Sequence, residues 1–157
     1  MKGLYRMFMS DNNNYINVRK AEISDSGIIS KLCGQLGYPA TKEDVRNKLQ
    51  GILSNYDHAV LVAEIEGAGV VGWVHAFVKH LFYVETAVEI GGLVVDEKNR
   101  KKGTGKALMQ GVEQWARENG YIGVVLRSNE DRKGAHIFYK SIGYSHIKNH
   151  LTFYKAL

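Results

Sequence analysis

The chain has 157 residues, of which 45% are hydrophobic and 24% charged, a balance typical of one soluble globular domain. No stretch approaches the roughly 18 apolar residues of a membrane span, and the single cysteine, Cys33, excludes an intramolecular disulfide. The formal net charge of +5 suits an anionic partner, but the cations form no long run, so an extended nucleic-acid footprint is not predicted.

The first 14 residues are predicted to be a flexible lead-in, followed by a single domain over residues 15–157. The lead-in contains scattered apolar residues and a polar run at 11–14, without the continuous apolar core of a signal peptide. Together with the single cysteine, this predicts a cytoplasmic protein.

The hydrophobic period changes repeatedly along the chain, and each change marks a predicted element. In chain order the pattern predicts a strand, two helices, three strands, a helix, a strand, a shorter helix and a final segment of one or two strands. Thr41 and Asp44 form an acidic variant of the capping box before the second helix, and residues 67–69 form a hairpin turn. The ten segments are 15–18, 28–36, 45–53, 59–66, 70–78, 86–95, 103–119, 121–126, 132–141 and 144–154.

The element order is therefore β-α-α-β-β-β-α-β-α-β. An antiparallel meander followed by a right-handed β-α-β unit predicts an α/β or α+β fold. Its central sheet is expected to be mixed, mostly antiparallel and flanked by helices.

The most informative stretch of the sequence is residues 88–110. An apolar strand leads into a basic loop with Gly103 and Gly105, and the loop opens directly into a helix. The free N–H groups and the dipole of a helix start attract anions, and glycine lets the backbone approach a pyrophosphate closely. The spacing matches neither a P-loop nor G-x-G-x-x-G, and a solvated turn that caps the helix remains an alternative. Positive charge comes from Arg100, Lys101, Lys102 and Lys106.

The string Arg100-x-x-Gly103-x-Gly105 resembles the acyl-CoA loop of the GNAT superfamily of N-acyltransferases, R/Q-x-x-G-x-G/A. Downstream, Asn129 and residues 135–144 resemble the second cofactor motif of that superfamily, N-x-x-A/S-x-x-F/L-Y-x-x-x-G-F/Y. The five residues between Asn129 and Ala135 exceed the spacing in many members. The resemblance covers residues 16–154 by element order and is specific over 88–144. It implies a GNAT-like fold, acetyl-CoA as the donor and direct transfer to an amine.

The resemblance also implies roles for the motif residues. The loop backbone would hold the pyrophosphate, the preceding strand would pair with the pantetheine amides, and Tyr139 would protonate the leaving thiolate. The alternatives are a core role for Tyr139 beside Phe138 and a helix-capping role for Asn129. The expected cofactor-binding residues are Leu93, Val94, Val95, Arg100, Lys101, Lys102, Gly103, Thr104, Gly105, Lys106, Asn129, Ala135 and Tyr139.

Glu89 is the predicted general base, because some members of the superfamily carry a glutamate on this strand at a similar distance before the loop. Strand alternation places Glu85 on the same side, so the two carboxylates could attract a cationic amine. The alternatives are a solvated strand face, a base role for His75 or His80, or a chain of water molecules.

The sequence thus predicts an N-acetyltransferase that acts on a primary amine, most readily a small molecule, by similarity to aminoglycoside-acetyltransferase-like members. The alternatives are a protein acetyltransferase acting on lysine or an N-terminus, and a non-catalytic acyl-CoA-binding module. Neither nucleic acid nor a membrane is an expected partner, and a homodimer is expected from the superfamily. No metal is predicted, because the histidines lack ligand spacing. A polycationic acceptor would need an acidic cleft, for which Glu64, Glu66, Glu85 and Glu89 are available.

Overall fold

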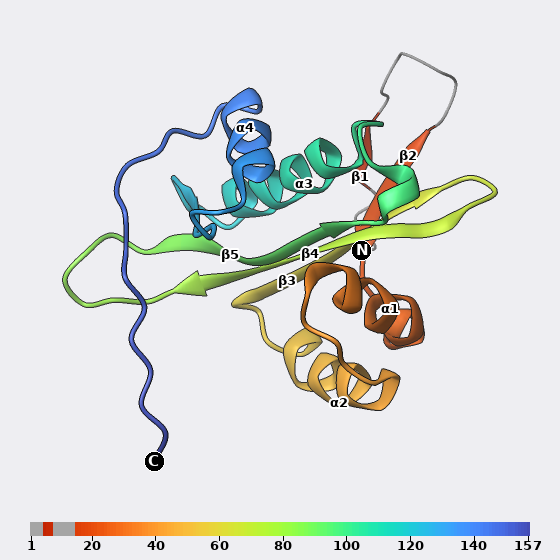
Figure 1. Cartoon of the computed structure of the whole chain (residues 1–157), viewed down its shortest axis with the longest axis horizontal. Helices are drawn as coiled ribbons and strands as arrows, with labels where there is room; N and C mark the ends of the chain where they lie inside the picture. Colours follow the sequence, from red (N-terminus) through yellow and green to blue (C-terminus); the bar gives the residue numbers. More distant parts are fainter. Residues whose placement is uncertain (1–4, 8–14) are drawn as a thin grey trace. The chain divides into compact units, whose positions relative to one another are not determined.

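The computed structural model describes residues 5–7 and 15–157 (Figure 1). The chain divides into two compact units, residues 1–126 and 127–157, and each is described by itself. Most of the lead-in predicted for 1–14 lies outside the described residues. Its residues Tyr5–Met7 form a strand, which the sequence pattern did not predict. The single domain over 15–157 stays a prediction.

The first unit is built on a six-stranded sheet whose strands follow chain order. Strands β1 to β5 are antiparallel to their neighbours, and β6 runs parallel to β5. This confirms the mixed, mostly antiparallel sheet. The strands are β1 Tyr5–Met7, β2 Ile16–Lys20, β3 His58–Ile65, β4 Gly69–Lys79, β5 Ala87–Val95 and β6 Val124–Leu126.

All four predicted helices are present. The capping box at the start of the second helix is confirmed: Thr41 Oγ1 accepts a hydrogen bond from Asp44 N at 3.1 Å, and Asp44 Oδ2 accepts one from Thr41 N at 3.3 Å. The helices are α1 Ser26–Leu36, α2 Lys42–Leu53, α3 Thr104–Glu118 and α4 Lys133–Ser141, with short 3₁₀ turns η1 Ile23–Asp25 and η2 Glu97–Asn99.

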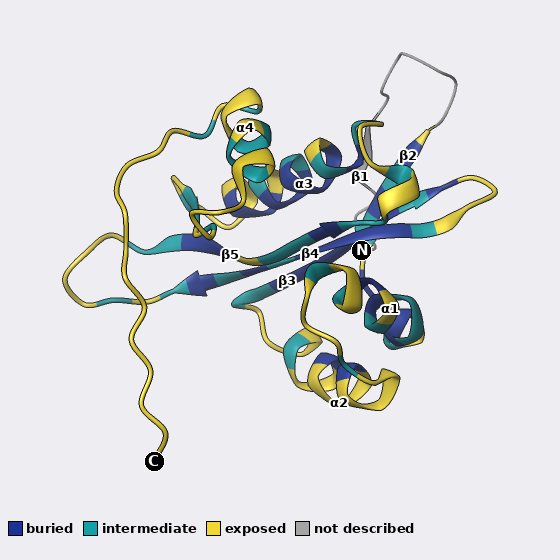
Figure 2. Ribbon diagram, viewed as in Figure 1, coloured by how far each residue is buried: buried dark blue, intermediate teal, exposed yellow. Residues whose placement is uncertain are grey.

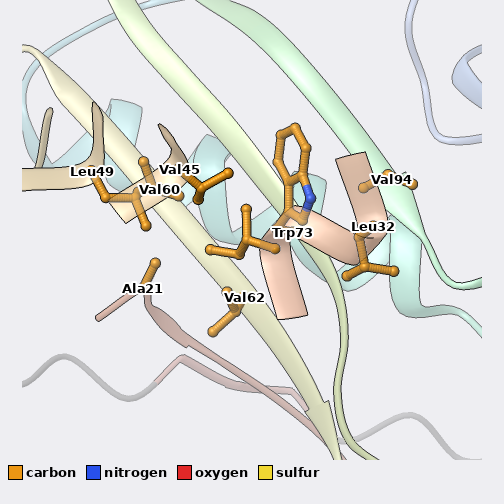
Figure 3. Packing of buried hydrophobic residues seen from close by; sticks show 9 residues of the cluster. Ala21, Leu32, Val45, Leu49, Val60, Val62, Trp73 and Val94 are labelled. Carbon is orange, nitrogen blue, oxygen red and sulfur yellow. The ribbon is translucent and has the colours of Figure 1, made fainter. Parts of the chain in front are cut away.

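Helices cover both faces of the sheet (Figures 1 and 2). On one face, α1 and α2 pack on β3 and β4 around Trp73 (Figure 3). On the other face, α3 lies so close that a side-chain carbon on Gly111 would be 2.9 Å from Leu61 Cδ1 and 3.1 Å from Val18 Cγ1. A larger residue at this position would have to displace the side chains of Leu61 and Val18. The cluster beneath α1 and α2 comprises Ala21, Ile29, Leu32, Val45, Leu49, Val60, Val62, Trp73 and Val94.

The final strand predicted for 144–154 is wrong. In the described part of the chain, no strand follows α4, and residues 145–157 are exposed. Apolar side chains do alternate there: Ile147, Leu151 and Phe153 are 75%, 84% and 87% exposed. Alternation alone cannot make a strand, because a strand also needs a neighbour to bond its N–H and C=O groups.

Candidate active site

The outer edge of β5 is open over its second half. β4 pairs with β5 as far as Val95, whereas β6 pairs with it only from Val88 to Ile90. Among the described residues, no strand bonds this edge from Gly91 to Val95. The predicted pantetheine-binding residues Leu93, Val94 and Val95 all lie on this segment. Apart from Val95 O, which accepts a hydrogen bond from Arg100 Nε, its outward main-chain groups can therefore bond an extended amide ligand as an added strand would.

A β-bulge lies where the open edge begins. His75 pairs with Gly92 and Ala76 with Ile90, so Gly91 has no partner on β4. Gly91 is exposed, and a side-chain carbon on it would lie 3.6 Å from His75 Nδ1 and 3.4 Å from Phe77 Cε1. The sequence reasoning assumed unbroken alternation through this point. The consecutive glycines were the signal it missed, because glycine inside a strand often marks a bulge.

The loop after β5 has the backbone of an anion site. Lys101 has a φ of 60° and Gly103 one of 86°, the left-handed region that lets the chain turn sharply into α3. Ala107 N donates to Gly103 O at 2.9 Å. The backbone N–H groups that precede Ala107 in the first turn of α3 therefore have no carbonyl acceptor inside the helix. Thr104 is 1% exposed, and its Oγ1 has no hydrogen-bond partner.

Two of the loop cations are held by the loop itself. Arg100 Nε donates to Val95 O at 3.1 Å, and Lys102 Nζ donates to Asn99 Oδ1 at 3.1 Å. The side chains of all four loop cations are exposed, so their charge remains available to a ligand in solvent.

The loop is also tied to the end of α1. Gln35 Nε2 donates to Asp96 Oδ1 at 2.9 Å, and Gln35 Oε1 accepts from Glu97 N at 3.0 Å. Asp96 Oδ2 accepts in turn from Asn99 Nδ2 at 2.9 Å. The hydrogen bond from Gln35, and after it the one from Asn99, holds the pKa of Asp96 below its usual value. The sequence reasoning missed Gln35 and Asp96, because they are 61 positions apart and belong to no motif.

Glu89 lies on the α1/α2 face of the sheet, paired with Phe77. It is 5% exposed, and its Oε2 lies 3.0 Å from Lys79 Nζ. The expected alternation of Glu85 with Glu89 is corrected: β5 begins at Ala87, and Glu85 lies in the exposed connection before it. The close charged neighbour of Glu89 is thus a lysine.

Two imidazoles lie next to each other on the same face. His58 Nδ1 and His75 Nε2 are 2.9 Å apart, and the rings are stacked with centroids 5.2 Å apart. Burial, and secondly the nearby His58, lowers the pKa of His75 to about 4. Phe77 lies beside both rings. The other candidate, His80, is exposed, and its Nε2 lies 3.2 Å from Asp57 Oδ2.

The remaining predicted residues belong to the second unit. Asn129 O accepts from Arg132 N and from His136 Nε2, both at 3.0 Å, and Asn129 Oδ1 accepts from Asp131 N at 3.3 Å. Asn129 therefore shapes the turn before α4, but it does not cap the helix, whose N-cap residue is Arg132 without a side-chain cap bond. Its cofactor contact stays a prediction. Ala135 and Tyr139 are half-buried on α4, and burial raises the pKa of the Tyr139 phenol.

The sequence profile of the acetyltransferase (GNAT) family matches residues 27–144. The chain belongs to this family. The resemblance and the prediction of an acyltransferase are thereby confirmed. A search of curated protein sequences found no match.

Solved GNAT structures share the fold. Glucosamine-6-phosphate N-acetyltransferase from Arabidopsis thaliana is 27% identical, with a TM-score of 0.75 over 88% of this chain and 97% of that one. The aminoglycoside 6'-N-acetyltransferase AAC(6')-Ih from Acinetobacter baumannii is 16% identical, with a TM-score of 0.77 over 90% and 99%. The aminoglycoside N-acetyltransferase AAC(6')-Iy in complex with CoA is 15% identical, with a TM-score of 0.81 over 95% and 100%.

Among residues 5–7 and 15–157, no group of three or more His, Cys, Asp or Glu side chains is placed to hold a metal ion. No described helix is long and apolar enough to cross a membrane.

Proposed function

We propose that this protein transfers the acetyl group of acetyl-CoA directly to a primary amine on a small molecule. The observation that carries the proposal is the continuity of β5. Its unpaired edge from Gly91 to Val95 runs into a loop that ends in the free N–H groups of α3. An extended ligand with amides at one end and a pyrophosphate at the other fits this arrangement.

The donor is assigned to main-chain groups. Leu93, Val94 and Val95 would bond the pantetheine amides, and an N–H near the bulge would polarise the thioester oxygen. The backbone of residues 101–106 would bond the pyrophosphate, with charge from the exposed lysines.

Glu89 and Tyr139 are the proposed catalytic groups. The carboxylate of Glu89 would hold the ammonium of the acceptor on the bulge side of β5, exchanging its Lys79 partner for the substrate. Its role as base stays a prediction. The raised pKa of Tyr139 keeps the phenol protonated at neutral pH, as a proton donor requires. The amine nitrogen attacks the thioester carbon, the C–S bond breaks, and the thiolate takes the phenolic proton. The proton that the nitrogen loses as it becomes an amide restores the phenol.

The acceptor is proposed to carry little positive charge. Two of the four available carboxylates are already paired: Glu64 lies 2.7 Å from Arg19, and Glu89 lies 3.0 Å from Lys79. The other two, Glu66 and Glu85, are exposed and lie beyond opposite ends of β4. These residues assemble no acidic cleft for a polycation. A small monoamine, such as an amino sugar, fits better.

The test is an amine panel with CoA thiol release as the readout. The panel contains amino sugars, aminoglycosides, polyamines, and peptides with a lysine or a free N-terminus. We expect turnover with small monoamines and a fall of about tenfold or more in kcat for Tyr139→Phe, with little change in KM. Turnover of peptides alone would replace the proposal by protein acetylation. No thiol release with any amine would refute catalysis.

A further inference from the structure

The stacked pair His58 and His75 has no task in the proposed function so far. Its two ends face different surroundings. His75 Nδ1 lies 3.6 Å from the position of a side-chain carbon on Gly91, the exposed bulge residue. His75 Nε2 lies 2.9 Å from His58 Nδ1. His58 lies at the first residue of β3, where the chain enters the sheet from an exposed turn. The two rings thus lead from the bulge to the margin of the sheet.

We propose that His75 and His58 form a two-imidazole relay that removes the proton of the acceptor ammonium from the Gly91 bulge. The inference rests on the proposed function, because it needs an amine bound beside the bulge. It names His75 as a further catalytic residue and His58 as its partner.

The relay moves one proton from the bulge to solvent. Neutral His75 carries its proton on Nε2 and donates it to His58 Nδ1, which leaves the lone pair of His75 Nδ1 facing the bulge. The ammonium N–H bond breaks and an N–H bond forms at His75 Nδ1. The Nε2 proton passes to His58 Nδ1, and His58 releases its own Nε2 proton to water. An ammonium and a water become an amine and a hydronium. For the reset, His58 Nε2 takes a proton from solvent, the His58 Nδ1 proton returns to His75 Nε2, and the Nδ1 proton of His75 passes to water in the emptied site, which restores both tautomers.

Three observations favour a relay over a single base. A hydrogen bond between two imidazole nitrogens needs one donor and one acceptor, so the two rings cannot both be charged. The lowered pKa of His75 keeps its ring neutral at neutral pH, so one ring nitrogen has a lone pair available to accept a proton. The alternative base, Glu89, is 5% exposed, and its Oε2 already pairs with Lys79 Nζ at 3.0 Å, so its carboxylate is engaged by another cation.

The absence of a side chain at Gly91 leaves open space next to His75 Nδ1. A methyl group there would fall against the rings of His75 and Phe77 and occupy the space in front of Nδ1. With glycine at position 91, this space is open to solvent and bounded by the rings of His75 and Phe77. The carbon atom that bears the substrate nitrogen fits into it.

The experiment compares His75→Gln, His58→Gln and the double variant with wild type, on the best amine of the panel. We expect kcat to fall about a hundredfold for His75→Gln and about tenfold or more for His58→Gln. The double variant should be no worse than His75→Gln, because the rings act as one unit. Acetyl-CoA affinity, measured by calorimetry, should stay unchanged in all three. His150→Gln, the same change on the exposed tail, is the matched control and should keep the wild-type kcat.

Two further readouts exclude a merely structural role. Free imidazole should restore part of the kcat of His75→Ala, because it can occupy the vacated space. The proton inventory of kcat in mixed H₂O and D₂O should be curved for wild type, with more than one proton in flight, and linear for His58→Gln.

The outcomes separate the relay from the proposed function. Wild-type kcat in His58→Gln would overturn the relay and leave the enzyme intact. A large loss in Glu89→Gln with wild-type kcat in both histidine variants would do the same and assign the base to Glu89. No turnover by wild type with any amine would refute the proposed function itself, and the relay with it.

Discussion

At the level of single residues, the imidazole of His75 has the clearest physical signature on this face of the sheet. It is largely buried, and a second imidazole lies 2.9 Å from its Nε2. Both conditions disfavour the imidazolium, so the fold stabilises the neutral form and lowers the pKa from 6.5 to about 4. A residue used for proton transfer thereby acquires a measurable effect on stability.

The pH dependence of folding should report this lowered pKa. Between pH 6.5 and pH 4 the unfolded chain binds a proton at residue 75 and the folded chain does not. The free energy of unfolding should therefore fall as the pH drops through this window, by about 3 kcal/mol in total from this one group. Urea unfolding of wild type and His75→Gln at several pH values measures it. The variant should lack this part of the slope, and parallel curves would contradict the assignment.

At the level of elements, the donor loop depends on a helix far from it in sequence. The two hydrogen bonds of Gln35 connect the last turn of α1 to Asp96 and to Glu97 N. Asp96 also accepts from the loop residues Lys98 and Asn99, so one carboxylate organises the chain between β5 and the glycines. The side of the molecule that carries α1 and α2 is therefore coupled to the donor side.

Removal of that coupling should weaken donor binding selectively. Gln35→Ala deletes two exposed hydrogen bonds, worth about 1 kcal/mol together, and should raise KM for acetyl-CoA about fivefold with kcat nearly unchanged. Gln114→Ala, which deletes only an exposed hydrogen bond to Glu118 within α3, is the control and should behave as wild type. Equal KM values for wild type and Gln35→Ala would show that the loop holds its shape without α1.

At the level of the whole molecule, the sequence predicted what depends on local periodicity and little of what depends on distant contacts. Apolar spacing located all four helices, and the Thr41 capping box located a helix start. The bulge at Gly91 depends on how β5 is registered against β4. The contact of Gln35 with Asp96 joins two segments that are 61 residues apart. Neither feature appears in a local sequence pattern.

Two errors at the chain ends have the same cause. Tyr5–Met7 form a strand because β2 offers them an edge, although three residues show no usable pattern. The tail alternates apolar residues at Ile147, Leu151 and Phe153, yet forms no strand among the described residues. Strand formation depends on the partner as much as on the pattern. For the site, the family motifs predict the glycine loop as the donor site, and this stays a prediction, whereas the His58 and His75 pair required the structure.

The most direct test of the account is calorimetric titration of acetyl-CoA into wild type, Gly105→Glu and Gly51→Glu. Gly105 lies in the first turn of α3 without a positive φ, so a glutamate there is compatible with the helix and places negative charge where the pyrophosphate is assigned. Gly51→Glu makes the same change in open space on α2. We predict that Gly105→Glu weakens acetyl-CoA binding by about tenfold or more, at least about 1.4 kcal/mol, while Gly51→Glu binds as wild type. Equal affinity for wild type and Gly105→Glu would contradict the donor site.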